Sequence, residues 1–245
     1  MTYGSFHLRF NLPLLALAGC ISLFGAWRPW VLLTFGLVLL IVVAFTTPWD
    51  NYAVAHGMWD FPDSRYAFRI WHLPVEEYCF FVLQGLEVML VCHGLSGLFG
   101  FWKPGIPGFG SLPVRLGLGT LLLLWALVGF WATRRLPRRG HYLFHLVYWF
   151  GPVLVLQWLL AGPLLVANGF AVTIATVLVG TWLTLADLAA VRRGLWIFDD
   201  RQILGLRWRQ SLPVEEIMFF YVTSLLVAQS YFMLGPVASK WLKSL

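Results

Sequence analysis

Two acidic pairs, each directly after a Pro-Val dipeptide, are the residues of this chain best suited to chemistry. Glu76 and Glu77 form one pair, and Glu215 and Glu216 form the other. Proline at the first position of a helix presets the backbone and loses no needed hydrogen-bond donor. The glutamates therefore fall in a first helical turn, facing the positive end of the helix. One such pair could simply complement the helix dipole, but two pairs in matched contexts favour an acid–base site.

An aromatic residue follows each carboxylate by one helical turn. Residues four apart share one side of a helix. The pairs are Glu76 with Phe80, Glu77 with Phe81, Glu215 with Phe219, and Glu216 with Phe220. Because aromatic faces attract cations, this spacing would suit a reaction that passes through a carbocation. The alternative is that these rings fill the core or face lipid.

Further polar and aromatic residues are candidates for substrate contact or for positioning the glutamates. They are Asp50, Asn51, Trp59, Gln84, Asp187, Trp196 and Thr223, together with the four phenylalanines. The two aspartates stand where apolar stretches end, so they are either partners of the glutamates or solvated boundary residues. Glu87 would lie about 16 Å deeper than Glu76, a depth at which an acid is functional by default. Its role stays open, because its counterpart in the second half is Leu226.

The composition places most of the chain in lipid. Of 245 residues, 60% are hydrophobic and 11% charged, whereas a soluble domain carries about 25% charge. The mean hydropathy is +0.77. We expect an all-α, polytopic transmembrane bundle of about seven spans, roughly at residues 10–27, 30–47, 74–99, 112–131, 143–165, 168–190 and 213–232. The net charge of +6 does not indicate nucleic-acid binding, because so few charges form no basic face.

An internal repeat organises these spans. Asp, Gly and Trp recur with the same spacing at positions 50, 57 and 59 and at positions 187, 194 and 196, each set followed by an acidic pair. We expect two three-helix repeats, residues 1–101 and 141–245, joined by a linker span in residues 102–140. The linker span makes the repeats parallel and puts both acidic pairs on one membrane face. That face carries 12 Lys and Arg against 5 on the other, which predicts that the N-terminus and both motifs are cytoplasmic.

At these residues the sequence resembles the small membrane-embedded lycopene cyclases of bacteria, archaea and fungi. The resemblance rests on Pro48-Trp49-Asp50-Asn51-Tyr52, on the two Gly-x-Trp runs and on the two Leu-Pro-Val-Glu-Glu-x-x-Phe-Phe runs, and it covers nearly the whole chain. In some members the repeats are separate chains, whereas here they are fused. The resemblance implies cyclisation of the linear ends of lycopene, usually to β-rings, without a flavin domain; we expect no cofactor and no metal.

The two halves are not interchangeable. Gln84 in the first half stands where the second half has Thr223, and Asn51-Tyr52 has no equivalent after Asp187. One half could therefore supply the acid while the other positions the substrate. The sequence leaves open which glutamate of each pair acts, whether β- or ε-rings form, and whether one or both ends are closed.

Ring closure by such a site would be an isomerisation. A proton adds to the terminal double bond, the next internal double bond attacks the cation, and a neighbouring carbon loses a proton. The protein must supply a carboxylic acid, a carboxylate base and a dry pocket. Four glutamates meeting near the apolar boundary would keep one of them protonated through burial and like-charge repulsion.

Three other functions are alternatives to a lycopene cyclase. A carotenoid hydratase would share the protonation step but capture the cation with water. A membrane prenyltransferase needs clustered aspartates for magnesium and diphosphate, and Asp199-Asp200-Arg201-Gln202 lacks the later aspartate. A non-enzymatic repeat transporter would use Glu87 as a relay.

If the chain is a lycopene cyclase, its expected partners are lycopene, membrane lipid, and other carotenoid-pathway enzymes or a second copy of the chain. The expected location is an integral membrane one, the inner membrane if the source is a bacterium.

Overall fold

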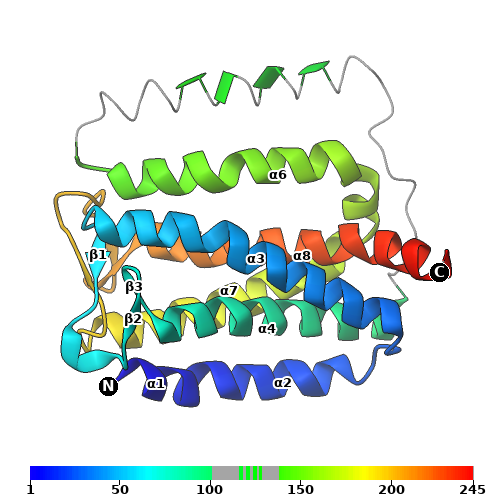
Figure 1. Cartoon of the computed structure of the whole chain (residues 1–245), viewed down its shortest axis with the longest axis horizontal. Helices are drawn as coiled ribbons and strands as arrows, with labels where there is room; N and C mark the ends of the chain where they lie inside the picture. The colour runs from blue at the N-terminus through cyan, green and yellow to red at the C-terminus, as the bar shows by residue number, and fades with distance from the viewer. Residues whose placement is uncertain (101–115, 118–119, 122–123, 126, 129–137, 245) are drawn as a thin grey trace.

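The computed structural model describes residues 1–100, 116–117, 120–121, 124–125, 127–128 and 138–244 (Figure 1). Within these ranges, five helices are long and apolar enough to cross a membrane. They are α3 (Pro29–Ala55), α4 (Val75–Phe99), α6 (His141–Ala167), α7 (Gly169–Val191) and α8 (Val214–Lys243). The prediction of a mostly helical fold with helices of membrane-spanning length and composition is confirmed. Most of the predicted fourth span, residues 112–131, lies outside the described residues, so the count of about seven spans stays a prediction.

The N-terminal segment is helical from Tyr3 onward, earlier than predicted. α1 (Tyr3–Phe6) passes into a π-helical turn, η1 (His7–Asn11), and then into α2 (Leu12–Ser22). Pro13 lacks an N–H group, which frees a carbonyl one turn earlier, and the widened turn lies directly before it. The early start brings Tyr3 into the bundle, where it is 1% exposed.

One of the spanning helices, α3, runs well past the end that the apolar pattern predicted. α3 continues past Pro48 to Ala55, so Asp50 lies within the helix and not at its exit. Asp187 lies inside α7, which ends within one residue of the span predicted at residues 168–190. Both aspartates are buried, at 2% and 0% exposure, so the alternative that they are solvated boundary residues is wrong. Packing against neighbouring helices extends α3 beyond what local propensity favours.

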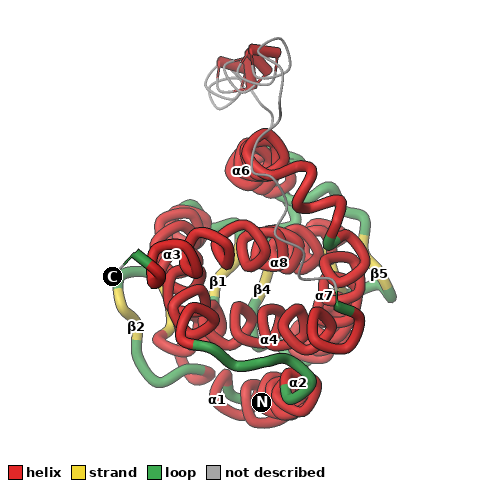
Figure 2. The backbone as a smooth tube through the Cα atoms, turned by 90° about the vertical axis from the view of Figure 1, so that its right-hand side faces the viewer, coloured by secondary structure: helices red, strands yellow, loops and turns green. Residues whose placement is uncertain are grey.

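The long helices form a central group with one helix on each flank. Viewed down the helix axes, α3, α4, α7 and α8 surround the centre (Figure 2). α2 packs on α4, and α6 packs on α8. The two flanking helices therefore cover the two helices that begin with the acidic pairs.

α4 and α8 lie side by side and run parallel. Near their starts, Gln84 Nε2 donates a hydrogen bond to Thr223 Oγ1 over 2.8 Å. Further along both helices, His93 Nδ1 is 2.9 Å from the Tyr231 hydroxyl. Because the contacts follow the same order along both helices, both Pro-Val-Glu-Glu runs lie at one end of the bundle.

Short strands shape the loops at that end. β2 (Arg69–Ile70) pairs with β3 (Leu73–Pro74) just before α4, and β5 (Arg207–Trp208) pairs with β6 (Leu212–Pro213) just before α8. β1 (Trp59–Asp60) pairs antiparallel with β4 (Ile197–Phe198), with Trp59 opposite Phe198. The first loop also holds a 3-10 turn, η2 (Asp63–Arg65). The β1–β4 pair joins the loop after α3 to the loop after α7.

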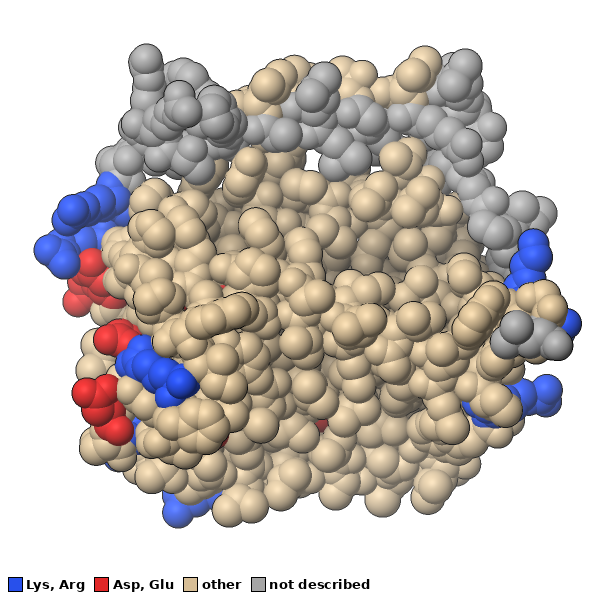
Figure 3. Space-filling view, viewed as in Figure 1, with Lys and Arg blue, Asp and Glu red and all other residues tan. Residues whose placement is uncertain are grey.

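The charged side chains gather at the two ends of the helices. Between them the visible face is a broad belt with almost no charge (Figure 3). Large apolar side chains are exposed on the long helices, for example Leu40 on α3 at 67% and Leu185 on α7 at 52%. An exposed apolar belt bounded by charges is the surface that a bilayer core requires.

Candidate active site

A small cavity lies where α4 and α8 begin. Its volume is about 40 Å³, which leaves room for a few water molecules. Every side chain that lines it is either aromatic or acidic. The lining residues are Tyr3, Trp49, Asp50, Trp59, Phe61, Glu77, Phe80, Tyr142, Trp196, Phe198, Glu216, Phe219 and Phe220.

Two of the four predicted glutamates face this cavity, and a tyrosine holds each of them. The Tyr3 hydroxyl donates to Glu77 Oε2 over 2.5 Å, and the Tyr142 hydroxyl donates to Glu216 Oε1 over 2.5 Å. Tyr3 comes from α1, and Tyr142 comes from the first turn of α6. Glu216 is 7% exposed, whereas Glu77 is partly buried. The same acid–hydroxyl arrangement thus occurs twice around one cavity.

Sequence reasoning missed both tyrosines. The available signal was spacing, because each tyrosine precedes its glutamate by 74 residues. That regularity extends the predicted repeat to the starts of α1 and α6. The predicted first span began at Phe10 and therefore left Tyr3 outside the helices, whereas the structure begins the helix at Tyr3.

The other two glutamates hold the loops. Glu76 Oε1 accepts a hydrogen bond from the Ala67 backbone N–H over 2.9 Å, and Glu215 Oε1 accepts one from the Leu204 N–H over 2.6 Å. Neither glutamate lines the cavity. The expected meeting of all four carboxylates in one pocket is therefore corrected to two. Adjacent residues on a helix point about 100° apart, so one member of each pair faces inward while the other faces the preceding loop.

The predicted aspartates are placed differently from one another. Asp50 lines the cavity together with Glu77 and Glu216. Asp187 is fully buried on α7 but does not line the cavity. Three carboxyl groups, two from the first half and one from the second, therefore share the cavity wall.

The two predicted tryptophans link the halves of the chain across the cavity. The Trp59 ring lies 5.2 Å from the Tyr142 ring, and the Trp196 ring lies 5.4 Å from the Tyr3 ring, measured between centroids. Each tryptophan therefore packs on the tyrosine from the other half. The β1–β4 pairing stabilises this crossed packing, because it holds together the two loops that carry the tryptophans. Both halves must be present for the cavity to form.

The four predicted phenylalanines separate into two groups. Phe80, Phe219 and Phe220 line the acidic cavity. Phe81 faces a second cavity deeper in the bundle, which Gln84 and Thr223 also line. Gln84 and Thr223 therefore join α4 to α8 below the acidic cavity and do not contact it.

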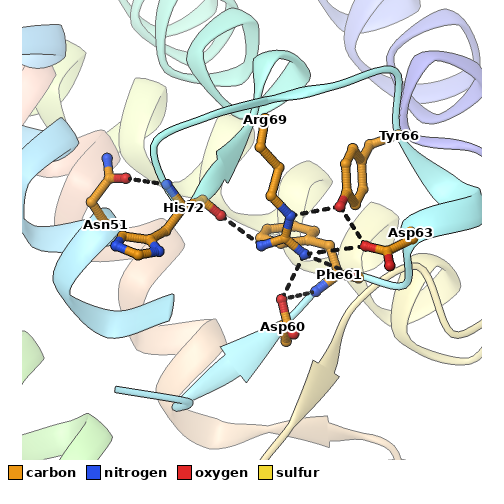
Figure 4. Close-up of polar contacts among 7 residues, drawn as sticks. All are labelled: Asn51, Asp60, Phe61, Asp63, Tyr66, Arg69 and His72. Carbon is orange, nitrogen blue, oxygen red and sulfur yellow. Dashed lines mark hydrogen bonds and ion pairs between the residues drawn. The ribbon is translucent and has the colours of Figure 1, made fainter. Parts of the chain in front are cut away.

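Asn51 and the loop before β3 are held by a polar network (Figure 4). Asn51 Oδ1 accepts from the His72 N–H over 3.0 Å. Arg69 Nη1 donates to His72 O over 2.7 Å, and its Nη2 donates to Asp60 Oδ1 over 2.8 Å and to Phe61 O over 2.9 Å. Asn51 thus positions the loop that carries Phe61 to the cavity, and it does not line the cavity itself.

Glu87 is separate from this site. It is 0% exposed on α4, and neither of its carboxylate oxygens has a hydrogen-bond partner among the described residues. It does not line the acidic cavity.

The fold and the cavity define a class: a helical protein with five helices long and apolar enough to cross a membrane among its described residues, and with an interior cavity lined by acidic and aromatic side chains. A family model described as lycopene cyclase matches residues 4–95 and 116–234. The chain belongs to the lycopene cyclase family.

Curated relatives carry names that agree with this family. A lycopene beta-cyclase from Halobacterium salinarum is 31% identical, over 84% of each chain. A bifunctional lycopene cyclase/phytoene synthase from Sporisorium reilianum is 33% identical over 95% of this chain and 34% of its own length. A bifunctional lycopene cyclase/phytoene synthase from Phycomyces blakesleeanus is 30% identical over 90% of this chain and 37% of its own length. The chain thus spans about a third of these fungal proteins. No solved structure matches it.

Proposed function

We propose that this chain is a lycopene cyclase that closes the linear ends of lycopene into rings, with Glu77 and Glu216 as its acid–base pair. The observation that carries the assignment is the pair of tyrosine-held glutamates in one cavity walled by aromatic rings. The names of the Halobacterium salinarum relatives favour β-rings as the product.

Two carboxyl groups are enough for the reaction, because one donates a proton and the other removes one. One carboxylic acid donates its proton to the terminal double bond and becomes a carboxylate. The next internal double bond attacks the resulting tertiary cation and forms the ring bond. The second carboxylate then removes a proton from the carbon next to the new cationic centre. Substrate and product are isomers, so the step needs no oxidant or reductant.

The tyrosines position the carboxyl groups. Tyr3 engages Oε2 of Glu77 and leaves Oε1 for proton exchange with the substrate. Tyr142 donates to Oε1 of Glu216 and leaves Oε2 for proton exchange with the substrate. A fixed carboxyl geometry lowers the entropic cost of bringing the proton to the correct carbon.

The aromatic walls favour ring closure over hydration. Trp, Tyr and Phe faces attract the positive charge of the intermediate. The cavity of about 40 Å³ has room for only a few waters, and a branched hydrocarbon end group must displace them to enter. With water displaced, the internal double bond is the nucleophile that remains. The small aromatic cavity therefore supports a cyclase over the hydratase alternative.

The paired contacts also support the predicted organisation. The two tyrosine–glutamate bonds, the crossed tryptophan contacts and the β1–β4 pair fit two parallel repeats, residues 1–101 and 141–245, around one site. With a linker span in residues 102–140 the chain has seven spans. The excess of Lys and Arg on the motif face orients the N-terminus and the site toward the cytoplasm, in the inner membrane if the source is a bacterium.

Pigment analysis in a lycopene-producing bacterial host tests the function. The wild-type chain is expected to give monocyclic or bicyclic carotenoid, and Glu77→Gln and Glu216→Gln are expected to leave lycopene unchanged at equal protein levels. In deuterated water, each closed ring should gain one deuterium from the solvent. Hydroxylated product would favour the hydratase. Rings formed at the wild-type rate by both variants would remove the two glutamates from the mechanism.

A further inference from the structure

A second cavity lies deeper in the bundle, among α3, α4, α6 and α8. Its volume is about 100 Å³, and most of its lining is apolar. Along α8 the lining runs from Phe219 to Ser230, which corresponds to about 16 Å of helix. The cavity is therefore long and narrow, and it follows the bundle axis away from the acidic end.

Three packed rings separate this cavity from the acidic one. Phe219 lines both cavities. Trp49 stacks on Phe219 with 5.6 Å between centroids, and Phe150 meets Trp49 at 5.0 Å and Phe219 at 6.1 Å. The two cavities thus share the Phe219 side chain as part of their common wall.

The corresponding region on the other side of the bundle is polar. Asn11 and Glu87 stand 139 residues before Phe150 and Leu226, which line the second cavity. Asn11 is 0% exposed and hydrogen-bonded with His7, and Glu87 is fully buried. A hydrocarbon chain placed there would contact a carboxyl group and an amide, whose burial already carries a free-energy cost. An extended hydrocarbon therefore fits the side with the second cavity better than the side with Asn11 and Glu87.

We propose that the second cavity holds the conjugated polyene of the substrate while the end group occupies the acidic cavity. The proposal rests on the proposed function and assigns the part of lycopene that does not react. Ile41 lines the cavity and is 48% exposed on the apolar surface of α3. The substrate therefore enters sideways from lipid between α3 and α6, where Phe45 stacks on Trp149 at 5.2 Å.

Filling the cavity tests the proposal. Val42 on α3 and Val153 on α6 both line it, and Val42→Trp and Val153→Trp are expected to lower the rate of lycopene cyclisation roughly tenfold or more by overpacking. Leu40→Trp and Leu156→Trp are matched controls on the same helices, because Leu40 and Leu156 are 67% and 41% exposed and line neither cavity. The controls should keep the wild-type rate. Filled variants at wild-type membrane levels that cyclise lycopene normally would overturn the proposal.

A binding measurement decides the matter if the filled variants fail to accumulate. The exposed cysteines Cys20 and Cys79 are replaced by serine, and Val153→Cys or Leu156→Cys is added. Membranes with and without lycopene are then treated with an apolar maleimide. Lycopene should slow labelling at position 153 and leave position 156 unchanged. Unchanged labelling at 153 in a chain that still closes rings would overturn the polyene site alone, whereas absence of ring closure by the wild type would overturn the proposed function.

Discussion

Replacing Tyr142 by phenylalanine isolates one hydrogen bond of the proposed site. The variant removes the hydroxyl that donates to Glu216 over 2.5 Å. It keeps the ring, which contacts Trp59 at 5.2 Å and stacks against Phe198 at 6.2 Å. The fold should therefore survive while the carboxyl group loses the group that orients it.

The size of the effect follows from burial. Glu216 is 7% exposed, so bulk water cannot readily replace the lost donor. A hydrogen bond to a charged group contributes about 1.5–3 kcal/mol. If that orientation matters in the transition state, the rate of ring closure falls by a factor of about 10–100.

Initial rates of ring formation in isolated membranes measure the effect, normalised to the amount of membrane-extracted protein. Tyr3→Phe should behave similarly, because it removes the equivalent bond to Glu77. Tyr221→Phe is the matched control: it removes the 2.7 Å hydrogen bond between half-buried Tyr221 on α8 and Thr181 on α7, neither of which lines the acidic cavity. If Tyr142→Phe and Tyr221→Phe are equally active, the tyrosine does not orient the acid.

Three further outcomes are expected. Glu76→Gln and Glu215→Gln should stay within about threefold of the wild-type rate, because an amide oxygen can accept the same loop N–H; inactivity at equal protein levels would return them to the catalytic set. Gln84→Leu should lower the thermal midpoint in detergent by removing the bond to Thr223, a loss of about 0.6 kcal/mol; an unchanged midpoint would mean that this bond does not hold α4 to α8. Arg69→Ala should speed proteolysis of the preceding loop and lower activity together; faster proteolysis with full activity would show that the loop does not shape the cavity.

Much of the fold could be predicted because a bilayer restricts what a sequence can do. Long apolar stretches with few charges can satisfy their backbone hydrogen bonds in lipid as helices, and five such helices are present among the described residues. Helix ends were harder to predict. Pro48 and Asp50 are typical of a helix exit, yet neighbouring helices keep them inside α3.

The sequence by itself determined the two acidic pairs and their shared chemical context, because the repeated spacing is written in the chain. Tertiary structure alone decided which member of each pair faces the cavity. Helix rotation is set by packing against neighbours, and it turns Glu77 and Glu216 inward while Glu76 and Glu215 meet the loops. It also brought in Tyr3 and Tyr142, whose contacts join residues far apart along the chain and depend on how the flanking helices dock.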